Sequence, residues 1–123
     1  MRALIDTGAK HSCINHKLIK RLKLTMNDPK GRCLYGANNN KIPVLGIANY
    51  DITINGLSMT SSYDVVENLS YDIILGMDFM TDNNAVIDIT GRLISFQNNL
   101  VIATMQNSRN KPIKVQNLNS ILI

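Results

Sequence analysis

The sequence predicts an all-β domain with one or two short helices. Short apolar runs, several of them alternating with polar residues, are separated by turns rich in Asn and Gly. These two residue types adopt the turn conformations that connect β-strands. A chain of 123 residues also supplies one modest hydrophobic core, and therefore one domain at most.

A short buried strand and a sharp turn open the chain. Two aliphatic residues run into the segment 6–9, which reads Asp-Thr-Gly-Ala. Gly8 lets the backbone turn tightly and approach a ligand closely, which a Cβ atom would hinder. The turn therefore presents the carboxylate of Asp6 at the end of the strand.

Residues 14–23 predict a short amphipathic helix that ends before the polar break at 27–29. Ile14, Leu18 and Leu22 recur at four-residue spacing and would form its buried stripe. Its basic residues are more typical of a solvated helix face than of a nucleic-acid site.

The middle of the chain predicts two β-hairpins. In the first, residues 32–35 pair with 41–45 around a polar tip. In the second, residues 50–54 alternate, Asn55-Gly56 is a type I′ turn signal, and the strand returns over 57–66.

The apolar run 72–75 predicts a further strand, which ends at Gly76. Asp78 is expected to N-cap a short helix over residues 79–83. A last hairpin, of residues 85–89 and 92–96, completes this part of the chain.

Beyond residue 104 the sequence is polar and loses its periodicity. We therefore expect residues 1–103 to form the domain and residues 104–123 to be a polar linker or tail.

The two cysteines, Cys13 and Cys33, do not make a disulfide framework, and no signal peptide or membrane-length apolar run is present. These observations favour a reducing, intracellular setting without a membrane segment. His11 and His16 with the cysteines match no common zinc spacing, so we expect no metal site and no cofactor.

Two motifs together resemble the retropepsin family, the aspartic proteases of retroviruses and retrotransposons, and within it the gypsy-type branch. They are Leu-Ile-Asp-Thr-Gly-Ala at 4–9 and Asp-Ile-Ile-Leu-Gly at 72–76. The Asp-Thr-Gly tripeptide alone also fits a structural turn whose aspartate accepts backbone hydrogen bonds. The preceding strand, the second motif at the family's separation and the hairpin between them favour the family.

The resemblance covers residues 2–97 and implies an acid-protease barrel with a flap hairpin. The one or two strands that usually precede the catalytic strand are missing here, so we expect a fragment of a polyprotein or a decayed insertion. Residues 100–103 or 120–123 are the candidates for a C-terminal interface strand.

The resemblance also implies roles for individual residues. Asp6 would be the catalytic carboxylate, Thr7 would hydrogen-bond to the partner subunit, and Gly8 and Ala9 would shape the turn and line the substrate channel. The flap would contain Gly36, Ala37, Asn38 and Asn39. The second motif would be Ile74, Leu75 and Gly76, and the substrate-binding residues would be Ala9, Ala37, Val44 and Ile74.

The implied function is an aspartic endopeptidase that cleaves a retroelement polyprotein in the cytoplasm or in a virus-like particle. Such enzymes use two carboxylates that share one proton, because two like charges so close together cannot both ionise. The other candidate aspartates, Asp28, Asp64, Asp72 and Asp88, lack a following Thr/Ser-Gly. A symmetric homodimer would supply the second acid.

Three alternatives remain open at this stage. The first is a non-catalytic retropepsin-like domain that only dimerises or serves as a scaffold. The second is a nucleic-acid-binding module that uses the basic residues of 17–23. The third is a cellular, ubiquitin-linked protease, because the DNA-damage-inducible retropepsin-like proteins share the catalytic signature.

Overall fold

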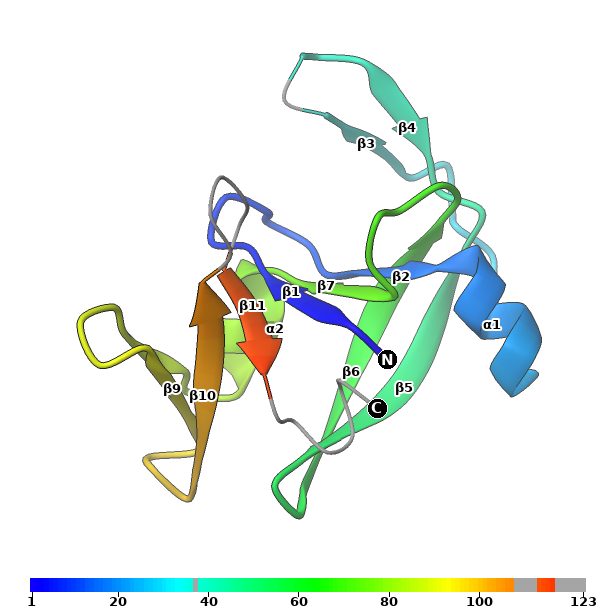
Figure 1. Ribbon diagram of the computed structural model, residues 1–123. Coiled ribbons are helices and arrows are strands. Elements are labelled where there is room, and N and C mark those ends of the chain that lie inside the picture. The colour runs from blue at the N-terminus through cyan, green and yellow to red at the C-terminus, as the bar shows by residue number, and fades with distance from the viewer. Residues whose placement is uncertain (37, 108–112, 117–123) are drawn as a thin grey trace.

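The computed structural model describes residues 1–36, 38–107 and 113–116. These residues form a nine-stranded sheet, a separate two-stranded hairpin and two short helices (Figure 1). The prediction of an all-β domain with one or two short helices is therefore confirmed, as a mainly-β fold with two short helices. In chain order the elements are β1 (Ala3–Ile5), β2 (Cys13–Asn15), α1 (His16–Leu22), β3 (Cys33–Tyr35), β4 (Lys41–Pro43), β5 (Gly46–Ile54), β6 (Leu57–Val66), β7 (Ile73–Leu75), α2 (Met77–Asp82), β8 (Val86–Asp88), β9 (Leu93–Phe96), β10 (Val101–Asn107) and β11 (Ile113–Gln116).

Three short neighbouring strands in the middle of the sheet, β2, β7 and β1, come from segments that are distant in the sequence. β7 lies between β1, to which it is parallel, and β2, to which it is antiparallel. Leu4 pairs with Ile74 and Ile5 with Leu75, so the strand residues of the two sequence motifs lie side by side. β2 also runs parallel to β6, and both of its edges are therefore occupied.

The long β5–β6 hairpin has the turn that the sequence predicts. Asn55 and Gly56 have φ values of 46° and 89°, and positive φ at both central residues is what a type I′ turn requires. β5 begins at Gly46, earlier than the predicted start at residue 50. The alternation of this strand buries Ala48, Ile52 and Ile54 in the main core.

The predicted hairpin with the polar tip is also present. β3 and β4 pair with each other outside the main sheet, and the hairpin projects away from it (Figure 1). Asn39 adopts φ 62°, which Asn tolerates better than most residues, and its N–H donates to Gly36 O at 2.9 Å. Ala37, predicted for the flap and for substrate binding, lies outside the described residues.

The predicted helix over 14–23 is wrong at its N-terminal end. Ile14 belongs to β2, whose pairing with β6 and β7 overrides the helical periodicity. The helix starts after Asn15, whose Oδ1 accepts from Lys17 N–H at 3.0 Å as an N-cap. Leu18 and Ile19 form the buried face, whereas Leu22 is 39% exposed.

The role predicted for Asp78 is wrong as well. α2 begins at Met77, so Asp78 lies within the first turn and Gly76 is the N-cap residue, with no side-chain cap hydrogen bond. The Asp78 carboxylate still accepts the Phe79 N–H in the first turn, and it also contacts a segment next to the N-terminal turn, as described below.

The C-terminal part of the sheet extends further than the sequence predicts. The β8–β9 hairpin is present as expected, but β10 continues past residue 104 to Asn107, and β11 pairs with both β10 and β1. The expectation of a linker or tail is therefore corrected at these two strands. Of the candidate interface strand 100–103, residues 101–103 lie in β10 and pair with β9, and residue 100 precedes that strand. Residues 120–123 lie outside the described residues.

The main core lies where the β5–β6 hairpin, the central strands and the two helices meet. Its largest fully buried side chains include Tyr63, Phe79 and Phe96, and the last two rings pack edge to face with their centroids 5.8 Å apart. A second, smaller cluster of Cys13, Val44 and Val66 lies apart from it. Within the described residues, no helix is long and apolar enough to cross a membrane.

Candidate active site

The Asp-Thr-Gly-Ala turn holds the Asp6 carboxylate in a defined position. Asp6 N–H donates to Leu75 O at 3.0 Å, which continues the β1–β7 ladder to the start of the turn. Gly8 N–H donates to Asp6 Oδ1 at 2.9 Å, and Ala9 N–H donates to Asp6 O at 3.2 Å. Asp6 remains half-buried, whereas Thr7 is exposed.

Asp6 lines a cavity of about 460 Å³ between this turn and the projecting hairpin. The turn and the residues after it contribute Asp6, Gly8, Ala9, Lys10 and His11. The hairpin contributes Cys33, Leu34, Tyr35 and Ile42, and the remaining lining residues are Cys13, Val66, Leu69 and Ile74. Among the described residues that line this cavity, Asp6 is the only carboxylate.

The cavity brings together some of the residues that the sequence predicts and leaves others aside. Asp6, Gly8, Ala9 and Ile74 line it, whereas the predicted flap-tip residues Gly36, Asn38 and Asn39 and the exposed Thr7 do not. Val44 is buried in the small cluster with Cys13 and Val66, against which Leu34, Ile42 and Ile74 pack. Leu75 and Gly76 are buried beside the turn.

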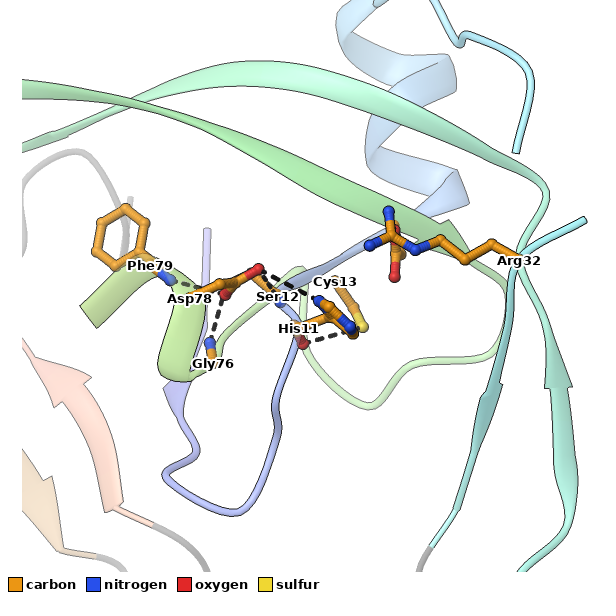
Figure 2. Close-up of polar contacts among 8 residues, drawn as sticks. His11, Ser12, Cys13, Arg32, Gly76, Asp78 and Phe79 are labelled. Atoms are coloured by element: carbon orange, nitrogen blue, oxygen red, sulfur yellow. Dashed lines mark hydrogen bonds and ion pairs between the residues drawn. The ribbon is translucent and has the colours of Figure 1, made fainter. Parts of the chain in front are cut away.

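Asp78 ties the chain after the turn to the start of α2 (Figure 2). Its Oδ2 accepts from Ser12 N–H at 3.1 Å, and its Oδ1 accepts from Ser12 Oγ–H at 2.6 Å. Gly76 N–H donates to the same Ser12 Oγ at 2.9 Å, and Phe79 N–H donates to Asp78 Oδ1 at 2.7 Å. Ser12 is fully buried, so these charge-assisted hydrogen bonds fix the two segments relative to each other.

Gly76 permits an unusually close approach of backbone segments at this point. A Cβ atom on Gly76 would lie 2.7 Å from Ala9 O and 2.9 Å from His11 O. Met77 N–H donates to Ala9 O at 2.8 Å, and Asp78 N–H donates to Lys10 O at 3.2 Å. The start of α2 therefore supports the loop that carries Asp6, and a side chain at position 76 would separate them.

A second buried carboxylate lies at the base of the hairpin. Asp64 on β6 is 3% exposed, and its Oδ1 accepts from Arg32 at 3.1 Å, just before β3 begins. Its Oδ2 is buried, and the part of the chain that the structure describes offers it no hydrogen-bond partner. Burial raises the pKa of Asp64, and the Arg32 guanidinium opposes that rise. This pair connects the hairpin to the main sheet.

The two cysteines both line the cavity, and both are free thiols. Burial is the main cause that raises the pKa of the Cys13 thiol to about 12, and the charges of Asp64 and Asp78 contribute to the same rise. A thiol with this pKa stays protonated at neutral pH and is a poor nucleophile. In the described part of the chain, no three His, Cys, Asp or Glu side chains form a group that could hold a metal ion.

Several lining residues were missed by the sequence reasoning. Leu34 and Ile42 are cross-strand partners in the hairpin, so the alternation of those strands could have placed them on one face. Lys10 and His11 directly follow the motif at 6–9, a position that marks them as neighbours of Asp6.

The site thus consists of an acid at the end of a buried strand, held by a glycine turn beside a largely apolar cavity. The family model described as "Retroviral aspartyl protease" matches residues 1–101, so this chain belongs to the retroviral aspartyl protease family. No curated protein matches the chain.

A solved structure is similar over most of the chain. It is the retroviral protease-like domain of Ddi1 from Leishmania major, with a TM-score of 0.65, 20% sequence identity and 81% of each chain covered. This likeness confirms the retropepsin-like fold.

Proposed function

We propose that this chain is an aspartic endopeptidase that acts as a homodimer, with one Asp6 carboxylate from each subunit. The observation that carries the proposal is the Asp6 carboxylate, which lies at the cavity and accepts the Gly8 N–H. One chain offers a single carboxylate among the described lining residues, so a second subunit would complete the acid pair.

The chemistry follows from the shared proton of such a pair. The ionised carboxylate takes a proton from a water molecule, whose oxygen attacks the peptide carbonyl carbon. The protonated carboxyl supplies a proton to the substrate, and collapse of the tetrahedral intermediate breaks the C–N bond. Thr7 would hydrogen-bond to the partner subunit, and an extended peptide would lie between the flap hairpin and the floor that includes Ala9 and Ile74.

We further propose a polyprotein of a gypsy-type retroelement as the substrate, with cleavage inside the cell or in a virus-like particle. The family membership and the two free thiols support this setting. The alternative is a non-catalytic domain that dimerises only.

The test is cleavage of a mixed peptide library at about pH 5, where an acid pair can hold one shared proton. We expect the wild-type chain to cleave and Asp6→Asn to lose cleavage while it stays folded, because an Asn Oδ1 can still accept the Gly8 N–H. Asp82→Asn is the matched control, since Asp82 is exposed on α2, and it should cleave as the wild type does.

A statine-type transition-state analogue should block the wild-type cleavage, and sedimentation should show a dimer under the assay conditions. Cleavage by Asp6→Asn would contradict the proposed mechanism. A folded wild-type dimer that cleaves nothing would favour the scaffold alternative.

A further inference from the structure

The lining of the cavity carries two basic side chains beside its carboxylate. Lys10 and His11 both line it, directly after the turn that holds Asp6. The other lining side chains carry no charge at neutral pH, and most of them are apolar. Apart from the catalytic acid, the charge that a bound peptide meets here is therefore positive.

The two basic residues differ in their partners. His11 Nδ1 lies 3.9 Å from Asp78 Oδ2, so an anion already faces its ring (Figure 2). Lys10 is exposed and has no ion-pair partner among the described residues. Its main chain is held in place, because Lys10 O accepts the Asp78 N–H at 3.2 Å. An unpaired ammonium group on a fixed backbone is thus available to a ligand in the cavity.

We propose that Lys10 forms a subsite that selects Asp or Glu side chains in the substrate. This inference rests on the proposed function, and it names the substrate class of the same site. A carboxylate next to Lys10 gains an ion pair, whereas a substrate Lys or Arg is repelled. If the enzyme is a symmetric dimer, one such subsite lies on each side of the scissile bond.

The catalytic acids limit where the preferred charge can lie. A pair that shares one proton keeps one negative charge, and this charge repels a carboxylate placed at the scissile bond itself. The selected Asp or Glu is therefore expected away from that bond, and the cleaved positions of the library give its place. The residues that flank the bond would instead meet the apolar lining, such as Ile42 and Ile74.

The experiment uses the mixed peptide library with the wild-type chain, Lys10→Glu and Lys17→Glu, and reads the cleaved positions by mass spectrometry. Lys17→Glu makes the same change of net charge in the first turn of α1, outside the cavity. We expect wild type and Lys17→Glu to enrich acidic over basic residues near the cleaved bond by about two- to fivefold at low salt, the range of a partly exposed ion pair. Lys10→Glu should invert the preference.

A second measurement works without cleavage. Two statine-type inhibitors that differ only in Glu or Lys two and three residues from the isostere are titrated into each variant. The Glu inhibitor should bind more tightly to the wild type, and the Lys inhibitor more tightly to Lys10→Glu.

The outcomes separate this inference from the proposed function. Cleavage without an acidic preference, or an acidic preference that survives in Lys10→Glu, overturns the subsite and leaves the endopeptidase in place. Absence of cleavage together with absence of binding by both inhibitors overturns the proposed function, and the subsite with it.

Discussion

Ser12 has a small side chain that fixes the structure near the Asp-Thr-Gly turn. It is fully buried, its hydroxyl donates to Asp78 Oδ1, and the same oxygen accepts the Gly76 N–H. No short sequence motif includes Ser12 together with its partners, because Gly76 and Asp78 lie 64 and 66 positions further along the chain.

We expect Ser12→Ala to lower the free energy of unfolding by about 2 kcal/mol. The substitution leaves the buried Gly76 N–H without its acceptor and removes a charge-assisted bond from Asp78. Urea unfolding measures the change. Ser62→Ala, at an exposed position of β6, should stay within about 0.5 kcal/mol of the wild type. Equal effects of the two substitutions would contradict this account of Ser12.

At the scale of the elements, the site depends on the contact between the start of α2 and the loop after β1. The backbone of Gly76 lies so close to Ala9 and His11 that a Cβ atom has no room, and Met77 N–H and Asp78 N–H bond to that loop. The same Gly76 ends the apolar motif 72–76, so the motif marks a contact between elements as well as a strand.

Gly76→Ala should therefore destabilise the fold by about 2–3 kcal/mol, because the loop or the helix must move to admit the methyl group. Urea unfolding measures this change, and the proposed cleavage by the remaining folded protein should also fall. Gly56→Ala is the comparison. A Cβ atom at position 56 would contact nothing within 4 Å. Because the φ of Gly56 is 89°, Gly56→Ala should lower the free energy of unfolding by about 1 kcal/mol, without an effect on cleavage. An unchanged stability of Gly76→Ala would show that the two segments are not held this closely.

At the scale of the whole molecule, the buried Asp64 links stability to pH. Burial raises its pKa in the folded chain, so the folded state keeps this proton to a higher pH than the unfolded state does. Above the usual pKa of an aspartate, the unfolded chain thus binds fewer protons at this site. The contribution of Asp64 to the free energy of unfolding consequently falls as the pH rises through the raised pKa.

We expect Asp64→Asn to remove this contribution. Urea unfolding of wild type and variant between about pH 4 and pH 7 should give a difference that changes with pH, by at most about 1.4 kcal/mol per pH unit. The wild type should lose stability relative to the variant as the pH rises. Parallel curves, or a wild type that gains stability over this range, would refute the assignment. Other carboxylates titrate in both proteins and cancel in the difference.

Most of the local structure could be predicted because its causes are local. The type I′ turn at Asn55-Gly56 and the alternation of its strands define one hairpin, and the polar tip between 32–35 and 41–45 defines the other. The apolar run that ends at Gly76 likewise predicted β7. The family motifs and the retropepsin-like fold belong to this predictable part.

The errors arose where distant strands compete with a local pattern. Ile14 fits a helical stripe, but pairing on both edges draws it into β2. The polar segment after residue 104 shows no periodicity, yet β11 finds partners in β10 and β1. The sequence predicts Asp78 as the N-cap, but Asp78 lies inside the first turn of α2, and its carboxylate bonds to Ser12 as well as to the Phe79 N–H.

The sequence by itself determined the mainly-β class, the hairpins and the Asp-Thr-Gly turn that presents Asp6, because these follow from residue types next to one another. Only the tertiary structure decided which side chains line the cavity with Asp6 and that Asp64 is buried beside Arg32. It also decided that no counter-ion for Lys10 lies among the described residues. These features depend on parallel strand pairing and on contacts between residues far apart in the chain. A local sequence pattern does not predict which distant segments pair or come into contact.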